Sequence, residues 1–273
     1  MSRFCGLCLP CLLCLVFAGC GGGGGFPDAP PADSPPPTGT FSLVWSVIDQ
    51  NSQPLSCERI AGQAMTVVAH NLAYASGETQ PFTCGTGAGT SQGVVPGTYE
   101  FDFELSGTFG LLARGTKQTP IVIPANTNTE LAPVTFQVEA IGGVALKLAS
   151  GKAGGNCGAI NAGGAGIEQV SITLRHSSDN SCEPITLAIT DGATQTGGTY
   201  TINCTTPLDR PCIEADQILT ATGVPSDAYT IGIRGKVASK VCWANNDLIQ
   251  VPPLNKTLLR TLNLGQQTQT PGC

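Results

Sequence analysis

Val95-Pro-Gly-Thr-Tyr-Glu-Phe-Asp-Phe-Glu-Leu105 is the stretch that decides the fold. From Tyr99 onward an apolar residue stands at every second position, and in an extended chain alternate side chains point to opposite faces. The Pro-Gly pair in front of this alternation is typical of a turn. The stretch therefore predicts a turn that leads into a strand with one buried face and one solvated face.

A second stretch of the same kind, Val224-Pro-Ser-Asp-Ala-Tyr-Thr-Ile-Gly-Ile233, stands in the other half of the chain. It belongs to a series of landmarks that recur in the same order in both halves, which indicates an internal repeat. The repeat predicts two domains, 39–139 and 140–273. The other landmarks of the first half are 41–47, Cys57, 65–70, 82–84, 119–123 and 134–138, and those of the second half are 144–148, Cys157, 170–176, 202–204, 248–251 and 262–264.

Most of these segments alternate apolar and polar residues, and clusters of glycine, proline and asparagine separate them. No useful window has the periodicity of a helix. Lysine and arginine number only 13 among 273 residues, whereas helix surfaces are normally built from such residues. The predicted fold is therefore all-β, with two tandem antiparallel β-sandwich domains of roughly seven short strands each, Ig-like or prealbumin-like.

The turn from Pro96 to Tyr99 and the strand after it resemble those of carboxypeptidase regulatory-like and collagen-adhesin B-type sandwiches. The second copy, from Pro225 to Tyr229, is one residue longer and lacks the glycine. The resemblance covers one turn and one strand in each domain, together with the overall rhythm of the strands. Proteins of that type are mostly spacers, adhesive stalks or accessory modules, so the resemblance implies a structural role, although a fold alone does not transmit a function.

Residues 1–19 have the layout of a secretory signal peptide, with Arg3 followed by an apolar run from Phe4 to Ala18. The run is shorter than the about 20 apolar residues that a transmembrane helix needs. The junction Phe17-Ala-Gly-Cys20 resembles the bacterial lipobox, with Phe17 where leucine is usual. The resemblance implies cleavage before Cys20 and a lipid on its sulfur, which would attach the chain to a membrane. The alternative is an ordinary signal peptide cut near Ala18, which would leave Cys20 as a thiol or a disulfide partner.

Residues 20–38 begin with the predicted lipidated cysteine and continue as a glycine-rich and then proline-rich segment. Such a composition cannot bury a core and predicts an extended linker, partly in the polyproline II conformation. Gly21 follows the cysteine, in place of the aspartate that often retains lipoproteins in the inner membrane. We therefore expect an exported protein that its lipid anchors in the outer membrane, on the periplasmic or the surface face.

The thirteen cysteines divide into three groups by position. Four lie between residues 5 and 14 and would leave with the signal peptide, and Cys20 is assigned to the lipid. The remaining eight are an even number in an oxidising compartment, which favours four disulfides over metal binding. Cys57 and Cys84 are the only pair in the first domain. In the second domain six cysteines allow 15 pairings. The repeat favours Cys157–Cys204, and Cys182–Cys212 and Cys242–Cys273 would then complete the set.

The chain carries a formal net charge of −6, which argues against a nucleic-acid partner because phosphates require a basic surface. His70 and His176 are its two histidines, and they stand at matching positions near the end of one strand in each repeat. No serine or cysteine nucleophile accompanies them in the pattern of a catalytic triad. None of the eight cysteines expected to form disulfides pairs with another at the spacing of a zinc finger. We therefore expect no enzyme activity, no metal and no cofactor.

The leading functional hypothesis is a lipid-anchored cell-envelope protein with a structural or adhesive role, whose sandwiches contact envelope polysaccharide or another envelope protein. The alternative is an accessory lipoprotein that binds a carbohydrate or another small ligand. A sugar site usually offers a flat aromatic ring. Trp45 alternates inward, which leaves Trp243 as the candidate ligand platform. Packing of Trp243 against the disulfide of its neighbour Cys242 is equally compatible with the sequence.

Overall fold

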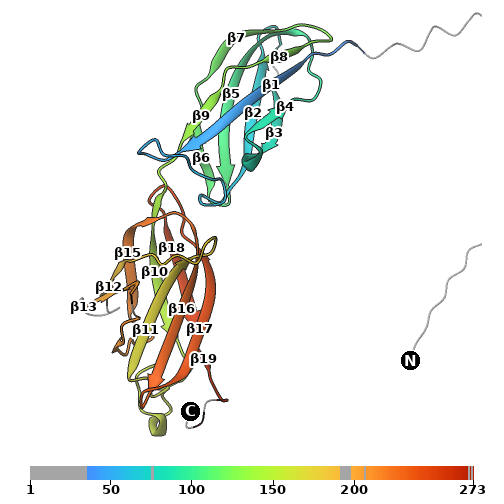
Figure 1. Cartoon of the computed structure of the whole chain (residues 1–273). Coiled ribbons are helices and arrows are strands. Elements are labelled where there is room, and N and C mark those ends of the chain that lie inside the picture. Colours follow the sequence, from blue (N-terminus) through green and yellow to red (C-terminus); the bar gives the residue numbers. More distant parts are fainter. Residues whose placement is uncertain (1–35, 75–76, 191–197, 206, 270, 272) are drawn as a thin grey trace, which may run out of the picture. The chain divides into compact units, whose positions relative to one another are not determined.

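The computed structural model describes residues 36–273, except 75–76, 191–197, 206, 270 and 272. The predicted signal peptide, Cys20 and nearly all of the linker lie outside the described residues. Strands β1 to β9 form one sandwich and β10 to β19 form a second, so the chain is nearly all β, as predicted (Figure 1). The helical segments in the described part are the 3-10 turns η1 (Cys84–Thr86) and η2 (Ile160–Ala162). No helix among these residues is long and apolar enough to cross a membrane.

The first sandwich is built from two sheets. One has the strand order β3-β2-β5-β6, with β7 also paired to β5, and the other has the order β4-β1-β8, with β9 also paired to β1. The strands are β1 (Thr40–Ile48), β2 (Gly62–Asn71), β3 (Gly77–Thr83), β4 (Ala88–Thr90), β5 (Gly97–Gly107), β6 (Gly110–Arg114), β7 (Gln118–Ile123), β8 (Asn128–Glu130) and β9 (Val134–Gln137).

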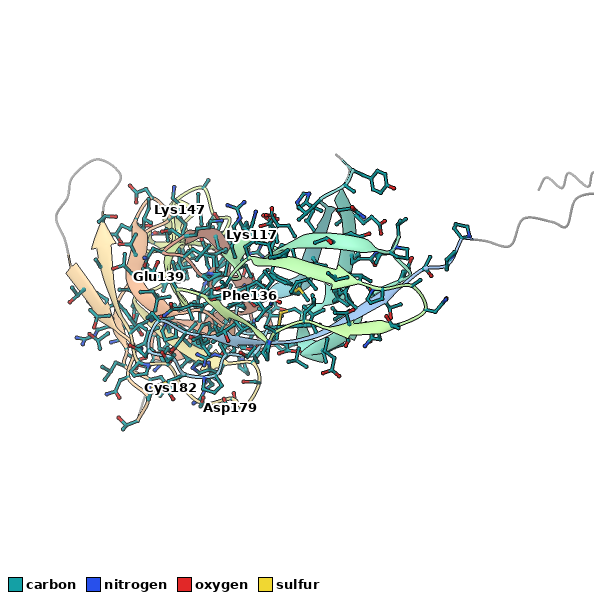
Figure 2. All side chains as sticks on the ribbon, turned by 90° about the horizontal axis from the view of Figure 1, so that it is seen from above. Lys117, Phe136, Glu139, Lys147, Asp179 and Cys182 are labelled. Carbon is teal, nitrogen blue, oxygen red and sulfur yellow. A yellow bond between two sulfur atoms is a disulfide. The ribbon has the colours of Figure 1, made fainter. Side chains whose placement is uncertain are left out.

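The decisive stretch becomes β5, which lies in the middle of its sheet between β2 and the pair β6 and β7. Its apolar side chains face the interior and are at most 1% exposed, whereas Glu100, Asp102 and Glu104 face outward. Phe136 of the opposite sheet is 0% exposed and lies among the side chains that fill the space between the sheets (Figure 2). Burial of each large apolar side chain contributes about 1.5 to 3 kcal/mol, which is why this alternation fixes the fold.

The second sandwich repeats this plan with two five-stranded sheets. Its two sheets have the orders β14-β11-β16-β17-β19 and β13-β12-β15-β10-β18. The strands are β10 (Ile141–Ala149), β11 (Gln169–His176), β12 (Thr186–Thr190), β13 (Gly198–Thr201), β14 (Arg210–Pro211), β15 (Ile218–Pro225), β16 (Ala228–Val237), β17 (Lys240–Gln250), β18 (Thr257–Asn263) and β19 (Gly265–Gln266).

Each sandwich has a buried tyrosine at the start of its central strand. The hydroxyl of Tyr99 donates a hydrogen bond to the carbonyl oxygen of Val95 at 2.5 Å, and the hydroxyl of Tyr229 donates one to Pro225 at 2.9 Å. Both acceptors stand four residues upstream. The arrangement is that of the tyrosine corner known from immunoglobulin-like sandwiches. It explains why the stretch before β5 and its second copy before β16 share a tyrosine at the same place.

The first strand of each sandwich pairs in parallel with the last strands, although most other pairs are antiparallel. In the first sandwich β1 pairs with β8 and then with β9. In the second, β10 pairs with β18 from Gly143 opposite Thr257 to Ala149 opposite Asn263. The alternation of the sequence predicts strands but does not report their direction, so this feature was not foreseen.

The segment Ile202–Cys204, a landmark of the repeat in the sequence, does not form a strand. Strand β13 ends at Thr201, and the residues after it are irregular. The hairpin of β12 and β13 extends the β15 edge of its sheet, and among the described strands the first sandwich has no counterpart of it. By sheet position the counterpart of β3, the edge neighbour of β2, is instead β14, the edge neighbour of β11.

Candidate functional site

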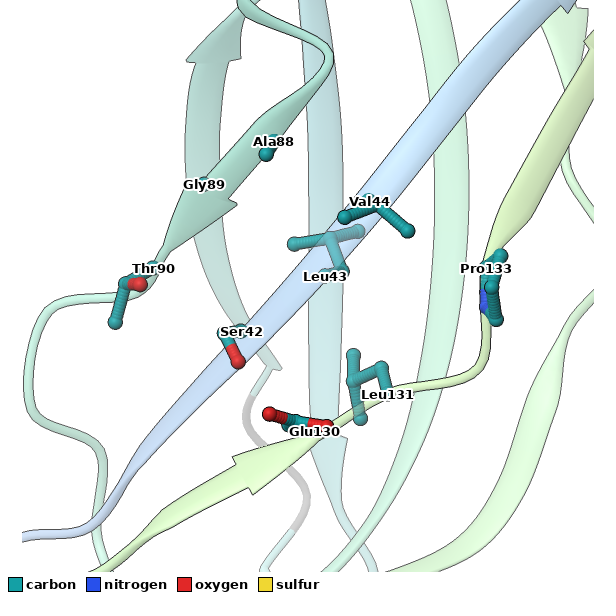
Figure 3. A pocket seen from close by; sticks show the side chains of 9 residues that line it. All are labelled: Ser42, Leu43, Val44, Ala88, Gly89, Thr90, Glu130, Leu131 and Pro133. Atoms are coloured by element: carbon teal, nitrogen blue, oxygen red, sulfur yellow. The ribbon is translucent and has the colours of Figure 1, made fainter.

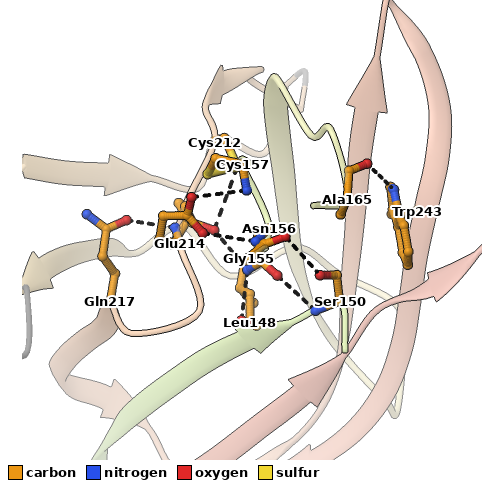
Figure 4. Close-up of a disulfide and its surroundings, with 11 residues drawn as sticks. Leu148, Ser150, Gly155, Asn156, Cys157, Ala165, Cys212, Glu214, Gln217 and Trp243 are labelled. Carbon is orange, nitrogen blue, oxygen red and sulfur yellow. Dashed lines mark hydrogen bonds between the residues drawn. A yellow bond between two sulfur atoms is a disulfide. The ribbon is translucent and has the colours of Figure 1, made fainter. Parts of the chain in front are cut away.

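Trp243, the predicted ligand platform, lies in β17 with its ring inside the second sandwich. The residue is 4% exposed, and its indole N–H donates a hydrogen bond to the carbonyl oxygen of Ala165 at 3.1 Å (Figure 4). The prediction of an exposed ring is wrong. The pairing of β16 with β17 skips Cys242, so a β-bulge turns two consecutive residues inward. The loop that contains Ala165 then covers the ring.

The structure contains four disulfides among the eight cysteines that were expected to form them. Cys57 bonds to Cys84, and Cys242 bonds to Cys273, as predicted. A disulfide that closes a loop of 22 to 55 residues contributes roughly 3 to 4 kcal/mol through the entropy of the unfolded chain. Such a set of disulfides belongs to proteins that fold in an oxidising compartment, which indicates an exported chain.

The other two predicted disulfides, Cys157–Cys204 and Cys182–Cys212, were wrong. Cys157 bonds to Cys212, and Cys182 bonds to Cys204. The physical reason is the inserted hairpin of β12 and β13, which Cys182 and Cys204 close. Cys84 directly follows β3, and its equivalent in the second sandwich directly follows β14. That residue is Cys212 and not Cys204, because the inserted hairpin lies before it in the sequence.

The loop between β10 and β11, residues 150–168, is held by polar side chains as well as by the Cys157–Cys212 bond (Figure 4). Asn156 is 1% exposed, and its amide donates hydrogen bonds to the carbonyl oxygens of Leu148 and Ile213. The Glu214 carboxylate accepts hydrogen bonds from the backbone N–H groups of residues 156 and 157. These hydrogen bonds satisfy the buried amide of Asn156 and tie the start of the loop to the segment after β14.

A hollow of about 530 Å³ lies over β1 in the first sandwich (Figure 3). Leu43 and Leu131 are buried beneath it, Val44 is 49% exposed, and the Glu130 carboxylate lies at one side. The remaining lining residues are small or polar: Ser42, Ala88, Gly89, Thr90 and Pro133. Its walls contain no aromatic ring on which a sugar could stack. The hollow therefore offers a shallow, mostly apolar surface with one charged group, the Glu130 carboxylate.

The outward face of β5 carries a strip of charged side chains that bind one another. The Lys117 ammonium lies 2.6 Å from the Glu100 carboxylate and 3.4 Å from that of Asp102. Hydrogen bonding to Glu100 raises the pKa of Lys117, so this lysine remains charged. His70 lies 3.3 Å from Asp102, and Arg114 lies 3.0 Å from Glu104. Because the charges are mutually paired and exposed, the strip is a solvated surface rather than a binding site.

His176, the last residue of β11, lies between two carboxylates. Its Nδ1 is 2.8 Å from Asp227 Oδ2, and its Nε2 is 3.0 Å from Glu183 Oε2. The three side chains are 15%, 9% and 19% exposed. The imidazole also packs against the ring of Tyr229, with 4.6 Å between the centroids. We refer to His176, Glu183, Asp227 and Tyr229 as the His176 cluster.

The two histidines do not occupy equivalent positions, contrary to the interpretation of the sequence. In the first sandwich the residue opposite Tyr99 is Asn71, whereas in the second sandwich the residue opposite Tyr229 is His176. His70 is therefore one residue away from the equivalent place and points to the other face of its sheet. The match in the sequence was misleading because β2 ends at Asn71, one residue after His70, whereas β11 ends at His176 itself.

Arg59, in the loop between β1 and β2, contacts residues of the second sandwich next to the His176 cluster. Its Nε lies 3.4 Å from Asp227 Oδ2. Its carbonyl oxygen accepts hydrogen bonds from Ser226 Oγ and Gln250 Nε2, both at 3.0 Å. Asp227 therefore faces two cationic side chains, the guanidinium of Arg59 and the imidazole of His176 when protonated.

Within the described residues, no three His, Cys, Asp or Glu side chains are grouped in a way that could hold a metal ion. His176 has a carboxylate partner on each ring nitrogen, so neither nitrogen is available to activate a separate nucleophile. The described cysteines are all in disulfides, which removes their thiols from nucleophilic chemistry. The chemistry that the His176 cluster can perform is the gain and loss of a proton.

No family model matches the sequence, and no curated protein matches it. Among solved structures, the chain is similar to a leucine-rich repeat protein from Bacteroides thetaiotaomicron, with 14% identity and a TM-score of 0.24 over 82% of this chain and 26% of that one. The shaft pilin SpaA from Lactobacillus rhamnosus GG matches with 10% identity and a TM-score of 0.28, covering 83% of this chain and 98% of that one.

A streptococcal ancillary pilin matches with 10% identity and a TM-score of 0.27, over 82% of this chain and 62% of that one. The chain therefore spans about a quarter of the first of these proteins and nearly all of the shaft pilin. TM-scores this low do not establish a shared fold over the aligned length. None of the three likenesses carries a conclusion about what this protein does.

Proposed function

We propose that the protein is a structural or adhesive element of the cell envelope, attached to a membrane by a lipid on Cys20 and built to transmit tension. Its sandwiches would contact envelope polysaccharide or another envelope protein. The single observation that carries this proposal is the parallel pairing of the first strand with the last strands in the first sandwich.

Parallel pairing decides how a sandwich responds to force. When the two ends of the first sandwich are pulled apart, β1 and β9 move in opposite directions along their common axis. All hydrogen bonds between them then carry force at the same time, because parallel bonds are evenly spaced along the pair. An antiparallel pair pulled at adjacent ends would instead open one bond after another. The sandwich is therefore suited to resist tension along the chain.

The hydrogen bonds at the two ends of β1 define a test by single-molecule force spectroscopy. Val138 N donates to Ile48 O at the far end of β1, and Asn126 N donates to Thr38 O at the near end. Handles at residues 38 and 139 shear the pairing, whereas handles at residues 38 and 126 peel it. We expect a clearly higher unfolding force for the first geometry at the same loading rate, since forced unfolding follows the unfolding rate. Equal forces would refute the role in tension.

The lipid anchor has a separate test. Cells that express the full chain are labelled with radioactive palmitate, and the wild type is compared with Cys20→Ser. We expect label on the wild type and none on the variant, because only a thiol can carry the thioether-linked lipid. Absence of label on the wild type would remove the anchor and leave the mechanical argument intact. A role as a carbohydrate-binding accessory protein has lost its supporting feature, since Trp243 is buried.

A further inference from the structure

We propose that His176 is a proton-operated latch in the second sandwich. When both ring nitrogens carry a proton, the imidazolium ties the end of β11 to Glu183 and to Asp227, and the loss of one proton on the way to alkaline pH releases one of the two ties. The sandwich would thus be held more tightly in mildly acidic surroundings than in alkaline ones.

Hydrogen-bonding capacity supports the latch directly. An ionised carboxylate only accepts hydrogen bonds, and a neutral imidazole has a single N–H to donate. Both ring nitrogens of His176 lie within 3.0 Å of a carboxylate oxygen, so only the protonated ring satisfies Asp227 and Glu183 together. In the neutral ring, the lone pair of one nitrogen faces a carboxylate at the same short distance. Charge-assisted bonds of this kind are about twice as strong as neutral ones.

The first sandwich shows that the fold does not require this cluster. At the equivalent place Asn71 stands opposite Tyr99, and Gly97 occupies the position of Asp227. A Cβ on Gly97 would lie 2.6 Å from Asn71 Nδ2, so a neutral amide and a glycine fill the space there. The second sandwich has replaced both residues with an ionisable pair. The corner is therefore built with or without a titratable group, and the histidine adds a dependence on pH.

The other charged groups around His176 act on its protonated form in both directions. The Arg59 guanidinium lies 3.4 Å from Asp227 Oδ2, the same oxygen that contacts His176 Nδ1, so it shares this carboxylate with the imidazole and opposes the positive charge of the ring. Asp179 adds a further negative charge, and Tyr229 contributes only its neutral ring, because burial raises the pKa of its phenol. With His176 charged, the positive and negative groups alternate from Arg59 through Asp227 and His176 to Glu183.

The direction of the pH effect follows from linkage. Burial alone would lower the pKa of His176, but hydrogen bonds to Asp227 and Glu183 and the charges of these groups outweigh it, so the pKa is raised above the ordinary 6.5. A histidine with a raised pKa in the folded state contributes stability that is complete below about pH 6.5 and is lost as the pH rises through the raised value. Each pKa unit corresponds to a tenfold change in the folding equilibrium constant.

The experiment exploits the fact that the chain has two histidines. NMR of the imidazole resonances of the disulfide-intact protein is followed from pH 5 to pH 9, with His70→Gln used to assign the signals. We expect the His176 signal to titrate with a midpoint above 6.5, and Glu183→Gln to move that midpoint down. A His176 midpoint at or below 6.5 overturns the latch without requiring any variant to fold.

Stability provides the second readout. The folding equilibrium constant of the wild type is expected to decrease between pH 6 and pH 9 by the factor that the measured midpoint dictates, tenfold for each unit above 6.5. His176→Gln should lose this part of the pH dependence, whereas the matched variant His70→Gln should keep it. An unchanged pH dependence in His176→Gln would contradict the proposal.

Discussion

Two tyrosines at equivalent positions, Tyr99 and Tyr229, fix how the central strand of each sandwich begins. Both rings are buried, with at most 1% of the residue exposed, and both hydroxyls bond a backbone carbonyl four residues upstream. The ring contributes apolar burial, and the hydroxyl holds the preceding turn against it. These two contributions can be separated experimentally, because phenylalanine keeps the first and removes the second.

We predict that Tyr229→Phe destabilises the second sandwich by about 1 to 2 kcal/mol, because the Pro225 carbonyl loses its donor. The measurement is the free energy of unfolding in urea with the disulfides intact. Tyr74→Phe is the matched control, since Tyr74 is 63% exposed, and its effect should be within experimental error. A loss in Tyr229→Phe no larger than in the control would show that the corner hydrogen bond is without consequence.

Single residues were the least predictable level from the sequence. The sequence left open whether Trp243 is exposed or packed, because alternation cannot reveal a β-bulge, which needs the pairing of β16 with β17. His176 was matched with His70, although the register pairs it with the counterpart of Asn71. Cys57 and Cys84 were paired correctly because no other partner existed in their half of the chain. The contents of the His176 cluster depend on three separate segments, which no local pattern connects.

At the scale of elements, the sequence did not predict that the loop between β10 and β11 is tightly packed. It contains glycines at points where two backbone segments touch. A Cβ on Gly158 would lie 1.9 Å from the carbonyl oxygen of Gly154, and one on Gly164 would lie 2.1 Å from that of Gly158. Real side chains cannot approach a backbone atom this closely. The glycines in this loop are therefore required by packing, although their sequence resembles a flexible linker.

We predict that Gly158→Ala destabilises the second sandwich by about 1 to 3 kcal/mol, since the added methyl group must displace backbone. Thermal unfolding of the disulfide-intact protein provides the measurement. Gly198→Ala in β13 is the control, because its Cβ would meet only Ile189 Cδ1 at 3.7 Å, an ordinary contact. If the two variants unfold at the same temperature, the loop tolerates a side chain at position 158 and is less tightly packed than described.

Strands that alternate strongly were predicted, and short polar strands were not. Residues 41–47 and 170–176 fall within β1 and β11, because half-buried strands impose a period of two on the sequence. Ala88–Thr90 and Asn128–Glu130 form β4 and β8 through pairing with β1 alone, and their composition contains no signal. The hairpin of β12 and β13 was not predicted. Because of this omission, the partners of Cys157 and Cys182 were assigned wrongly.

At the scale of the whole molecule, the disulfides decide which part of the chain can extend under force. Cys157–Cys212 bypasses 55 residues, and Cys242–Cys273 bypasses the last 31. A pull on Cys273 therefore enters the second sandwich at Cys242 in β17 and leaves β18 without tension. After reduction, the same pull reaches β18 and loads its parallel pairing with β10.

We predict that reduction lengthens the extension released when the second sandwich unfolds by roughly 300 Å, since an extended residue spans about 3.3 to 3.6 Å and both bypasses then open. Force spectroscopy between residue 140 and Cys273, with and without a reducing agent, measures the difference. The double variant Cys182→Ser and Cys204→Ser is the matched control, because its 22-residue loop lies inside the segment that Cys157–Cys212 already bypasses. Its oxidised extension should equal that of the wild type. A longer extension in this variant would mean that Cys157 and Cys212 are not joined, and the sandwich would then lack the limit on stretching that this disulfide imposes.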